Sequence, residues 1–265
     1  MRVIGVIPSR YESTRLPGKP LADICGKPMI QYVYERATGS KLLGNVIVAT
    51  DDERIVEAVQ GFGGEAALTS PDHPNGTSRV AEVARNMDTD IVINIQGDEP
   101  LIDSRMIDEV VHLLLSDPDV VTATLCSPLD DPAMINDPNV VKVVLDRHGD
   151  ALYFSRSPIP YRRNETEDCA YYEHIGIYGF RKEFLLRYVE LPETPLSRLE
   201  SLEQLRILES GYPIRVGVTK YPHGGPNVNT PEDLEKVREM VRRTIGCDAP
   251  ENTAGGEAAA DAVEK

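Results

Sequence analysis

A loop near the N-terminus concentrates positive charge behind an apolar run. Residues 7–21 have the sequence IPSRYESTRLPGKPL, which includes Arg10, Arg15 and Lys19. Small and hydroxyl residues such as Ser13 can expose backbone N–H groups to phosphate oxygens, and the cations can offset the charge of a leaving pyrophosphate. The glycine spacing differs from that of the GxxxxGK[ST] phosphate loop. The segment predicts a triphosphate site, and a solvated basic loop is the alternative interpretation.

Two adjacent carboxylates follow a second apolar run. Residues 94–100 have the sequence NIQGDEP, so Asp98 and Glu99 come directly after the run at 91–95. If that run is a parallel strand, both side chains lie at the carboxyl edge of the sheet, where open α/β folds bind ligands. A carboxylate there suits Mg²⁺, which takes oxygen ligands and bridges to substrate phosphates. A turn or a helix cap is the alternative use of these acids.

A third polar segment precedes a helical pattern. Residues 72–79 have the sequence DHPNGTSR, and the pattern at 77–87 predicts a helix. Asn75, Gly76 and Thr77 can therefore offer amide and hydroxyl groups at the start of a helix. Such groups can bind the edge of a nucleotide base, and a capped loop without a ligand is the alternative.

The elements that must position these segments alternate along the first hundred residues. Strands are predicted at 3–8, 45–50 and 91–95, and helices at 51–60, 77–87 and from about residue 28. Such alternation predicts βαβ units, and near-continuous Val and Ile runs are typical of strands covered by helices on both faces. The predicted fold is α/β: a three-layer sandwich with a mostly parallel, Rossmann-like, nucleotide-binding sheet.

The remaining chain is richer in strand patterns and ends in a polar segment. Strands at 120–125, 140–145, 151–154, 175–180 and 214–218 are expected to complete the sheet and add a small strand-rich lobe within about 120–220. Thr230 and Pro231 open a helix whose apolar residues are Leu234, Val237, Val241 and Ile245. We expect a single domain over residues 1–246 and a disordered acidic tail at 247–265.

Composition excludes several classes of protein. The chain has 265 residues, 41% of them hydrophobic, with a formal charge of −15, which argues against binding to nucleic acid phosphates or anionic lipid. No run approaches the roughly 20 apolar residues that span a bilayer, and we expect a cytoplasmic protein without a membrane partner. The four cysteines form no CxxC pair and are expected to be free thiols.

Eight segments together resemble one enzyme family. IPSRYESTRLPGKPL, DHPNGTSR, NIQGDEP, DPNVVKVVLD, ALYFSR, HIGIYGFR, LESLEQLR and NTPEDLEKVR are similar to the motif series of the 3-deoxy-manno-octulosonate cytidylyltransferases, in the same order and across residues 1–245. The resemblance implies transfer of CMP from CTP to the anomeric hydroxyl of a 3-deoxy-2-ulosonic acid, with release of pyrophosphate. It also implies Mg²⁺ as cofactor, a homodimer, and a place in nucleotide-sugar and lipopolysaccharide biosynthesis.

The resemblance assigns roles by position. It implies that the CTP-binding residues are Arg10, Ser13, Arg15, Lys19, Asn75, Gly76, Thr77 and Arg79. It implies that the sugar is bound by Gln96, Arg156, His174, Tyr178, Glu203 and Gln204, with Arg156 pairing with the sugar carboxylate. Lys19 and Arg15 would stabilise the leaving pyrophosphate, and Asp98 would hold the metal.

One position departs from the family pattern. Where the family has Val-Asp-Thr-Pro-Glu-Asp and uses the first Asp as a second metal ligand, this chain has Asn229. An amide oxygen can still bind Mg²⁺, but it brings no charge. A working site with weaker metal affinity, a shifted substrate role and an inactive nucleotide-binding relative are all compatible with Asn229.

Two alternative enzymatic functions stay open from the sequence. A cytidylyltransferase for another acidic substrate, such as an amino-octulosonate, a nine-carbon ulosonic acid or a phosphonate, would share the CTP half. A glycosyltransferase on a similar sheet would usually carry a DxD-like metal motif, and the acids at 98–99 lack that spacing.

Overall fold

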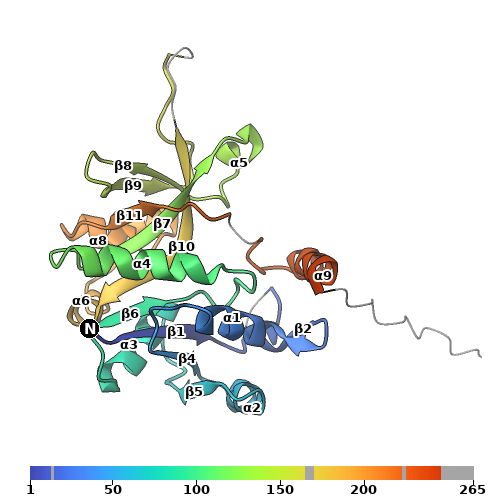
Figure 1. Ribbon diagram of the computed structural model, residues 1–265. Coiled ribbons are helices and arrows are strands. Elements are labelled where there is room, and N and C mark those ends of the chain that lie inside the picture. Colours follow the sequence, from blue (N-terminus) through green and yellow to red (C-terminus); the bar gives the residue numbers. More distant parts are fainter. Residues whose placement is uncertain (13–14, 165–169, 223–224, 246–265) are drawn as a thin grey trace, which may run out of the picture.

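The computed structural model describes residues 1–12, 15–164, 170–222 and 225–245 (Figure 1). The predicted acidic tail at 247–265 lies outside these residues. The strands are β1 (Val3–Ser9), β2 (Asp23–Ile24), β3 (Lys27–Pro28), β4 (Asn45–Thr50), β5 (Glu65–Leu68), β6 (Ile91–Asn94), β7 (Thr122–Leu129), β8 (Lys142–Leu145), β9 (Ala151–Ser155), β10 (Tyr171–Arg181) and β11 (Arg215–Val218). The helices are η1 (Lys19–Leu21), α1 (Met29–Thr38), α2 (Glu53–Gly61), α3 (Gly76–Asn86), α4 (Ser104–Ser116), α5 (Pro132–Asn136), α6 (Lys182–Tyr188), α7 (Pro195–Glu200), α8 (Leu205–Glu209) and α9 (Pro231–Ile245).

The main sheet has the strand order β11-β7-β10-β6-β1-β4-β5. Neighbours pair in parallel at β1–β4, β1–β6, β4–β5 and β7–β11, whereas β10 is antiparallel to both β6 and β7. The sheet is therefore mostly parallel, as predicted, with β10 inserted in the opposite direction between β6 and β7.

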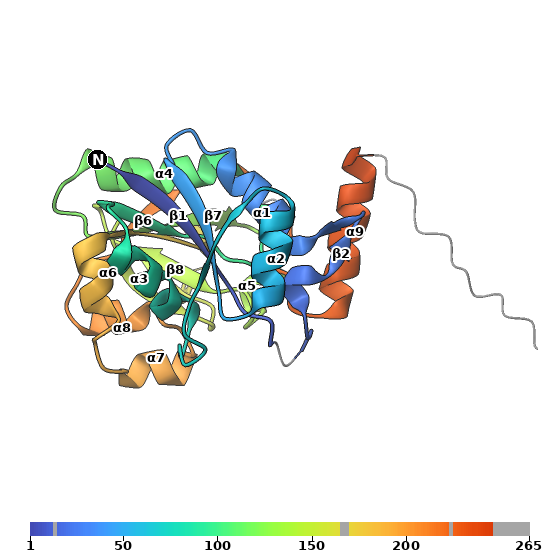
Figure 2. The same ribbon diagram turned by 90° about the horizontal axis from the view of Figure 1, so that it is seen from below.

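Helices cover both faces of this sheet. One hydrophobic cluster joins the strands to α1, α2 and α4, and a second joins the opposite side chains to α3, α6 and α8. Figure 2 shows α1 and α4 on one side of the strands and α3, α6 and α8 on the other. This arrangement confirms the three-layer α/β sandwich, because alternate side chains of each strand reach opposite helix layers.

A small antiparallel unit extends from β10. The long strand β10 pairs with β8, and β8 pairs with β9 through Val143↔Phe154 and Val144↔Tyr153. These strands project beyond the parallel part of the sheet (Figure 1). They form a strand-rich extension within the predicted limits of the lobe.

Helix α9 packs against the β2–β3 hairpin instead of the main sheet (Figure 2). Thr230 and Asp233 exchange backbone-to-side-chain hydrogen bonds at its start, which satisfies N–H groups of the first turn. Leu234, Val237 and Val241 are buried against Ile24, Met29 and Tyr32. The predicted apolar face is confirmed at these three positions, and the side chain of Ile245 lies outside the described part of the chain.

Two further expectations can be compared with the structure. Cys126 is a buried free thiol, but Cys25 is disulfide-bonded, so the expectation of free thiols is wrong for Cys25. Sequence spacing missed this bond because a disulfide depends on three-dimensional proximity. Within the described residues, none of the helices has the length and apolarity needed to cross a membrane.

Candidate active site

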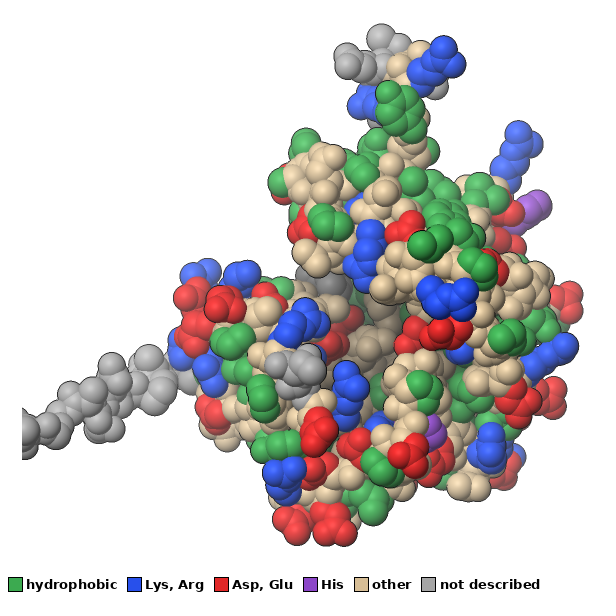
Figure 3. Space-filling model, turned by 180° about the vertical axis from the view of Figure 1, so that it is seen from behind, with side chains coloured by type: hydrophobic (Ala, Val, Ile, Leu, Met, Phe, Trp, Pro, Cys, Tyr) green, Lys and Arg blue, Asp and Glu red, His purple; other side chains and the backbone are tan. Residues whose placement is uncertain are grey.

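A polar cavity of about 410 Å³ opens at the carboxyl ends of β1 and β6. Figure 3 shows a hollow near the middle of one face, with Lys and Arg side chains at its rim. The predicted residues that line the cavity are Arg10, Arg15, Lys19, Asn75, Gly76, Arg79, Gln96, Asp98, Glu203 and Asn229. The fold thus brings together five stretches of the chain, the first at residues 10–19 and the last at residue 229.

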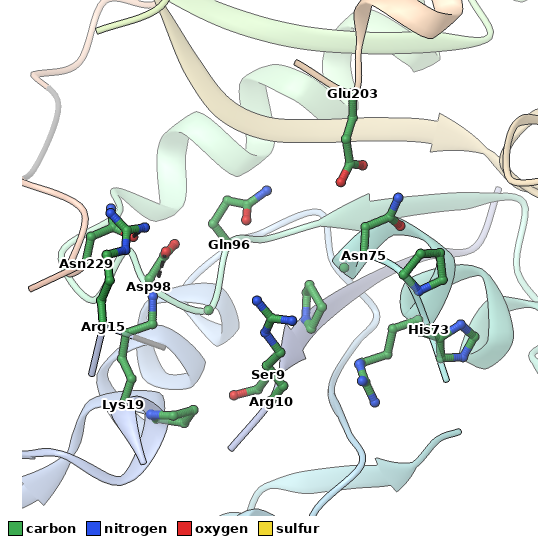
Figure 4. Close-up of a pocket in the computed structure, with 16 residues that line it drawn as sticks. Ser9, Arg10, Arg15, Lys19, His73, Asn75, Gln96, Asp98, Glu203 and Asn229 are labelled. Carbon is green, nitrogen blue, oxygen red and sulfur yellow. Dashed lines mark hydrogen bonds and ion pairs between the residues drawn. The ribbon is translucent and has the colours of Figure 1, made fainter. Parts of the chain in front are cut away.

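The loop after β1 carries Arg15 and Lys19 into one end of the cavity (Figure 4). Gly18 has a φ of 67°, and a Cβ there would lie 3.2 Å from the Tyr11 hydroxyl oxygen, so the turn before η1 favours glycine. This turn presents Lys19, while Arg15 approaches from the preceding segment (Figure 4). Ser13, predicted to bind CTP, lies outside the described residues.

Asp98 comes from the segment that follows β6. A Cβ on Gly97 would lie 2.7 Å from the Pro8 carbonyl oxygen, so only glycine lets this segment pass so close to β1. Lys19 Nζ lies 2.9 Å from Asp98 Oδ2, and Arg15 Nη2 donates to Asn229 Oδ1 at 3.0 Å. The two predicted metal ligands therefore lie at the same end of the cavity, each bonded to a cation (Figure 4).

The start of α3 forms the other end of the cavity. Asn75 is the N-cap of α3, and its Oδ1 accepts a hydrogen bond from the Ser78 N–H at 2.9 Å. Asn75 therefore caps the helix and also lines the cavity. Arg79 is buried, donates to Asp51 Oδ2 at 2.7 Å and to Thr69 Oγ1 at 2.5 Å, and supports the cavity wall. Thr77 does not line the cavity but donates to Glu203 Oε2 at 3.1 Å.

Glu203 closes the cavity from above in Figure 4, with its carboxylate pointing inward. Glu203 as a whole is exposed, yet removal of water around the carboxylate raises its pKa, an effect that the Thr77 hydrogen bond partly offsets. Gln96 lies between Glu203 and Asp98 in the same view and donates to the Gly176 carbonyl oxygen at 3.0 Å. These two side chains are the predicted sugar-binding residues that the fold brings to the cavity.

His174 and Tyr178 do not line this cavity. The centroid of the His174 ring lies 5.0 Å from that of Phe154, in an edge-on arrangement, and 5.3 Å from that of Tyr178. Burial lowers the pKa of His174 to about 3. Burial raises the pKa of Tyr178 well above its ordinary value, and its hydroxyl has no hydrogen-bond partner among the described residues. Both side chains belong to an aromatic row on β10, and their role toward a sugar stays a prediction.

Arg156 and Gln204 are also outside the cavity lining. The Arg156 guanidinium donates to backbone carbonyl oxygens of Glu200 at 2.7 Å and Pro138 at 2.9 Å, so it is held by the chain itself. Gln204 is buried at the start of α8. Pairing of Arg156 with a substrate carboxylate stays a prediction.

Sequence reasoning missed some lining residues, of which His73 is the most polar. Its Nε2 is hydrogen-bonded to Glu82 Oε2, and this bond is the main cause that lowers the pKa of Glu82. His73 belongs to the segment already singled out, but its partner is nine residues further along α3. A helical projection from Asn75 would have placed Glu82 one turn beyond Ser78 on that helix, facing the same loop.

The donor set fits a divalent cation only in part. Among the described residues, no group of three or more His, Cys, Asp or Glu side chains could hold a metal by itself. Asp98 offers a carboxylate and Asn229 an amide oxygen at one end of the cavity. One carboxylate is typical of Mg²⁺ sites in which substrate phosphates and water supply the other ligands.

The chain that forms this cavity is similar to known cytidylyltransferases. A family model described as Cytidylyltransferase matches residues 4–216. The 3-deoxy-manno-octulosonate cytidylyltransferase of Solibacter usitatus is 52% identical over 244 residues, covering 92% of this chain and 96% of that protein. The chain belongs to the 3-deoxy-manno-octulosonate cytidylyltransferase family. The family member from Geobacter metallireducens is 50% identical and covers 92% of this chain and 99% of that protein.

Solved structures agree with membership of the 3-deoxy-manno-octulosonate cytidylyltransferase family. A CMP:2-keto-3-deoxy-manno-octonic acid synthetase complexed with CTP superposes with a TM-score of 0.88 at 48% identity, covering 92% of this chain and all of that chain. A cytidylyltransferase from Leptospira borgpetersenii superposes with a TM-score of 0.62 at 19% identity, which supports the fold alone.

Proposed function

We propose that this protein transfers CMP from CTP to the anomeric hydroxyl of 3-deoxy-manno-octulosonate and releases pyrophosphate. One observation carries the proposal: a single cavity holds Arg10, Arg15 and Lys19, the carboxylate of Asp98 and the start of α3. The chain that forms this cavity is 52% identical to a 3-deoxy-manno-octulosonate cytidylyltransferase. The anomeric hydroxyl attacks the α-phosphorus in line, and no covalent enzyme intermediate is needed.

The chain's own residues act by positioning and by neutralising charge. Arg15 and Lys19 stabilise the pyrophosphate as it leaves, and Arg10 adds a third cation along the triphosphate. The backbone N–H groups at Asn75 and Gly76 face the nucleotide from the start of α3. Gln96 and Glu203 hold sugar hydroxyls and so fix the direction of attack.

Magnesium is the proposed cofactor, held by Asp98 and Asn229. When bound, Mg²⁺ supplies a Lewis acid that polarises the phosphate and lowers the pKa of the attacking hydroxyl. The remaining partners are proposed to be CTP, the acidic sugar and a second copy of the chain in a cytoplasmic homodimer. The formal charge of −15 is the reason to propose no nucleic acid or membrane partner.

Pyrophosphate release with a panel of substrates tests the function. CTP with 3-deoxy-manno-octulosonate is expected to give the highest kcat/KM, above an amino-octulosonate and a nine-carbon ulosonic acid. Replacing CTP by UTP should abolish most turnover, because a site built on specific hydrogen bonds rejects analogues that leave buried groups unpaired. Equal rates with UTP, or a higher rate with another acid, would contradict the proposed substrates.

A further inference from the structure

The positions expected to hold a metal are already bonded to cations of the protein. Lys19 Nζ lies 2.9 Å from Asp98 Oδ2, and Arg15 Nη2 lies 3.0 Å from Asn229 Oδ1. Figure 4 shows these four side chains gathered at one end of the cavity, with Arg10 further along it. The residues expected to bind phosphates and those expected to bind metal therefore bond to each other.

The Lys19 ammonium is fixed on the metal side of the cavity by more than one bond. Besides Asp98, it donates to the Val228 carbonyl oxygen at 2.9 Å, and the Val228 N–H donates to the Asp98 carbonyl oxygen at 2.9 Å. The side chains of Lys19 and Asp98 are only 17% and 24% exposed. Water screens a partly buried pair less than a surface pair, so this contact is stronger than an ordinary surface ion pair.

We propose that Lys19 is a resident cation that neutralises Asp98 while the site is empty, and that its transfer to the triphosphate frees Asp98 for a divalent cation. The inference rests on the proposed function, because it assigns the triphosphate to this end of the cavity. Binding of CTP and binding of the metal are then positively coupled through one side chain. The Arg15–Asn229 contact contributes less, because the amide carries no charge to neutralise.

Thermodynamic linkage makes the coupling between CTP binding and metal binding reciprocal. If CTP removes Lys19 from Asp98, it raises metal affinity by some factor, and the metal must raise CTP affinity by the same factor. Couplings of this kind are typically about 5- to 150-fold. The metal-free, nucleotide-free protein should accordingly bind divalent cations poorly.

The first test measures Mn²⁺ binding to the full chain without nucleotide, by electron paramagnetic resonance of the free ion. Lys19→Met is expected to bind Mn²⁺ at least about fivefold more tightly than the wild type, because the resident cation is gone. Arg10→Met is the matched control, because it removes one positive charge from the same cavity but does not remove the Lys19–Asp98 ion pair. Unchanged affinity in Lys19→Met, or an equal gain in Arg10→Met, would overturn the proposal.

The second test measures CTP binding in EDTA by calorimetry. Asp98→Asn should tighten CTP binding, because Lys19 no longer has to leave a carboxylate. Glu203→Gln is the matched control, since it removes a cavity carboxylate that is bonded to Thr77 and not to Lys19. The gain from Asp98→Asn should largely disappear in a Lys19→Met background. If it persists there, the effect is simple repulsion between Asp98 and phosphate, and the proposal is wrong.

These measurements separate the inference from the proposed function. Mn²⁺ affinities are read without substrate, so they report on Lys19 even if the protein releases no pyrophosphate with any ulosonic acid. An active enzyme whose Lys19→Met variant binds Mn²⁺ like the wild type would keep the proposed function and lose the inference.

Discussion

At the scale of single residues, Arg15 and Lys19 enter the cavity from one loop and face its predicted pyrophosphate end. We expect Arg15→Ala and Lys19→Ala each to lower kcat by about 10²–10³, corresponding to about 2.7–4 kcal/mol of lost transition-state stabilisation. Steady-state pyrophosphate release measures the change. Lys41→Ala removes an exposed cation that follows the C-terminal end of α1 and does not line the cavity, so it should keep the wild-type rate. A near wild-type rate in either cavity variant would mean that the loop is only a solvated basic surface.

Asn229 brings an uncharged oxygen to the predicted metal position. Asn229→Asp adds a carboxylate there, and we expect it to lower the Mg²⁺ concentration needed for the half-maximal rate by several-fold, because hard cations gain affinity from ligand charge. Asp98→Asn should be far more damaging, since it leaves neither position with a carboxylate. The measurement is the rate as a function of free Mg²⁺ at saturating CTP.

The outcome also distinguishes the interpretations of Asn229. If the wild type is inactive at every Mg²⁺ concentration and Asn229→Asp restores turnover, the chain is an inactive relative. If the substitution leaves the Mg²⁺ dependence unchanged, position 229 does not face the metal and its bond to Arg15 has another purpose.

His174 makes folding stability depend on pH. Its pKa is about 3 in the folded protein and near 6.5 when unfolded, so below about pH 6.5 the unfolded chain takes up a proton that the folded chain rejects. This contribution to stability is complete above pH 6.5 and falls as the pH decreases. Between pH 7.5 and 5 the loss from this residue is about 2 kcal/mol, and any folded pKa below about 4 gives the same value.

Urea unfolding at pH 7.5 and pH 5 measures this effect. His174→Gln keeps a polar side chain near Thr124 but cannot titrate, so its free energy of unfolding should fall less than that of the wild type over this interval, by about 2 kcal/mol. Parallel losses in the two proteins would show that His174 titrates normally when folded.

At the scale of elements, α9 attaches the Asn229 segment to the body through one apolar face. Leu234 is 5% exposed and packs in the cluster with Ile24 and Met29, so Leu234→Ala should lower the free energy of unfolding by about 2–5 kcal/mol. Arg243→Ala on the same helix alters a side chain that is 80% exposed and should change it by less than about 0.5 kcal/mol. Chemical denaturation checks both values, and equal effects would mean that α9 is not anchored by this face.

Local patterns predicted the parallel half of the sheet well. The strand at 45–50 coincides with β4, and the helix at 77–87 differs from α3 by one residue at each end. Strand β5 was missed because Glu65–Leu68 is short and contains two alanines, which are weak strand formers. The antiparallel insertion of β10 could not be predicted, since pairing with β6 and β7 is set by distant parts of the chain.

The same distinction applies to the candidate site. Arg10, Arg15, Lys19 and Asp98 follow strands whose carboxyl ends must share one edge, so their meeting in one cavity was predictable. The Lys19–Asp98 and Arg15–Asn229 bonds were not, because they depend on how the segment before α9 returns to the β1 loop. Burial of His174 depends on the aromatic row of β10, which residue spacing alone does not specify.

At the scale of the whole molecule, the chain after α9 is predicted to add nothing to the folded body. Residues 247–265 contain almost no large apolar side chains, so they cannot bury enough surface to offset the entropy of ordering. Deleting residues 248–265, which keeps all four cysteines, should change neither the melting temperature nor kcat/KM. A drop of several degrees in the melting temperature would mean that this segment docks on the body.

The position of β10 has a consequence for the nascent chain. Strands β1, β4, β5 and β6 are synthesised early and lie next to one another in the sheet. The other edge of β6 is paired with β10, which comes after β7, β8 and β9 in the chain. At about 5–20 residues per second, a ribosome needs about 4 to 17 s to proceed from the end of β6 to the end of β10. During this interval the apolar β6 edge is available to other chains, and β7 has no parallel strand of the sheet beside it. The half that carries β1, β4, β5 and β6 is therefore translated first, and translation of residues 171–181 sets the moment at which the two halves can join.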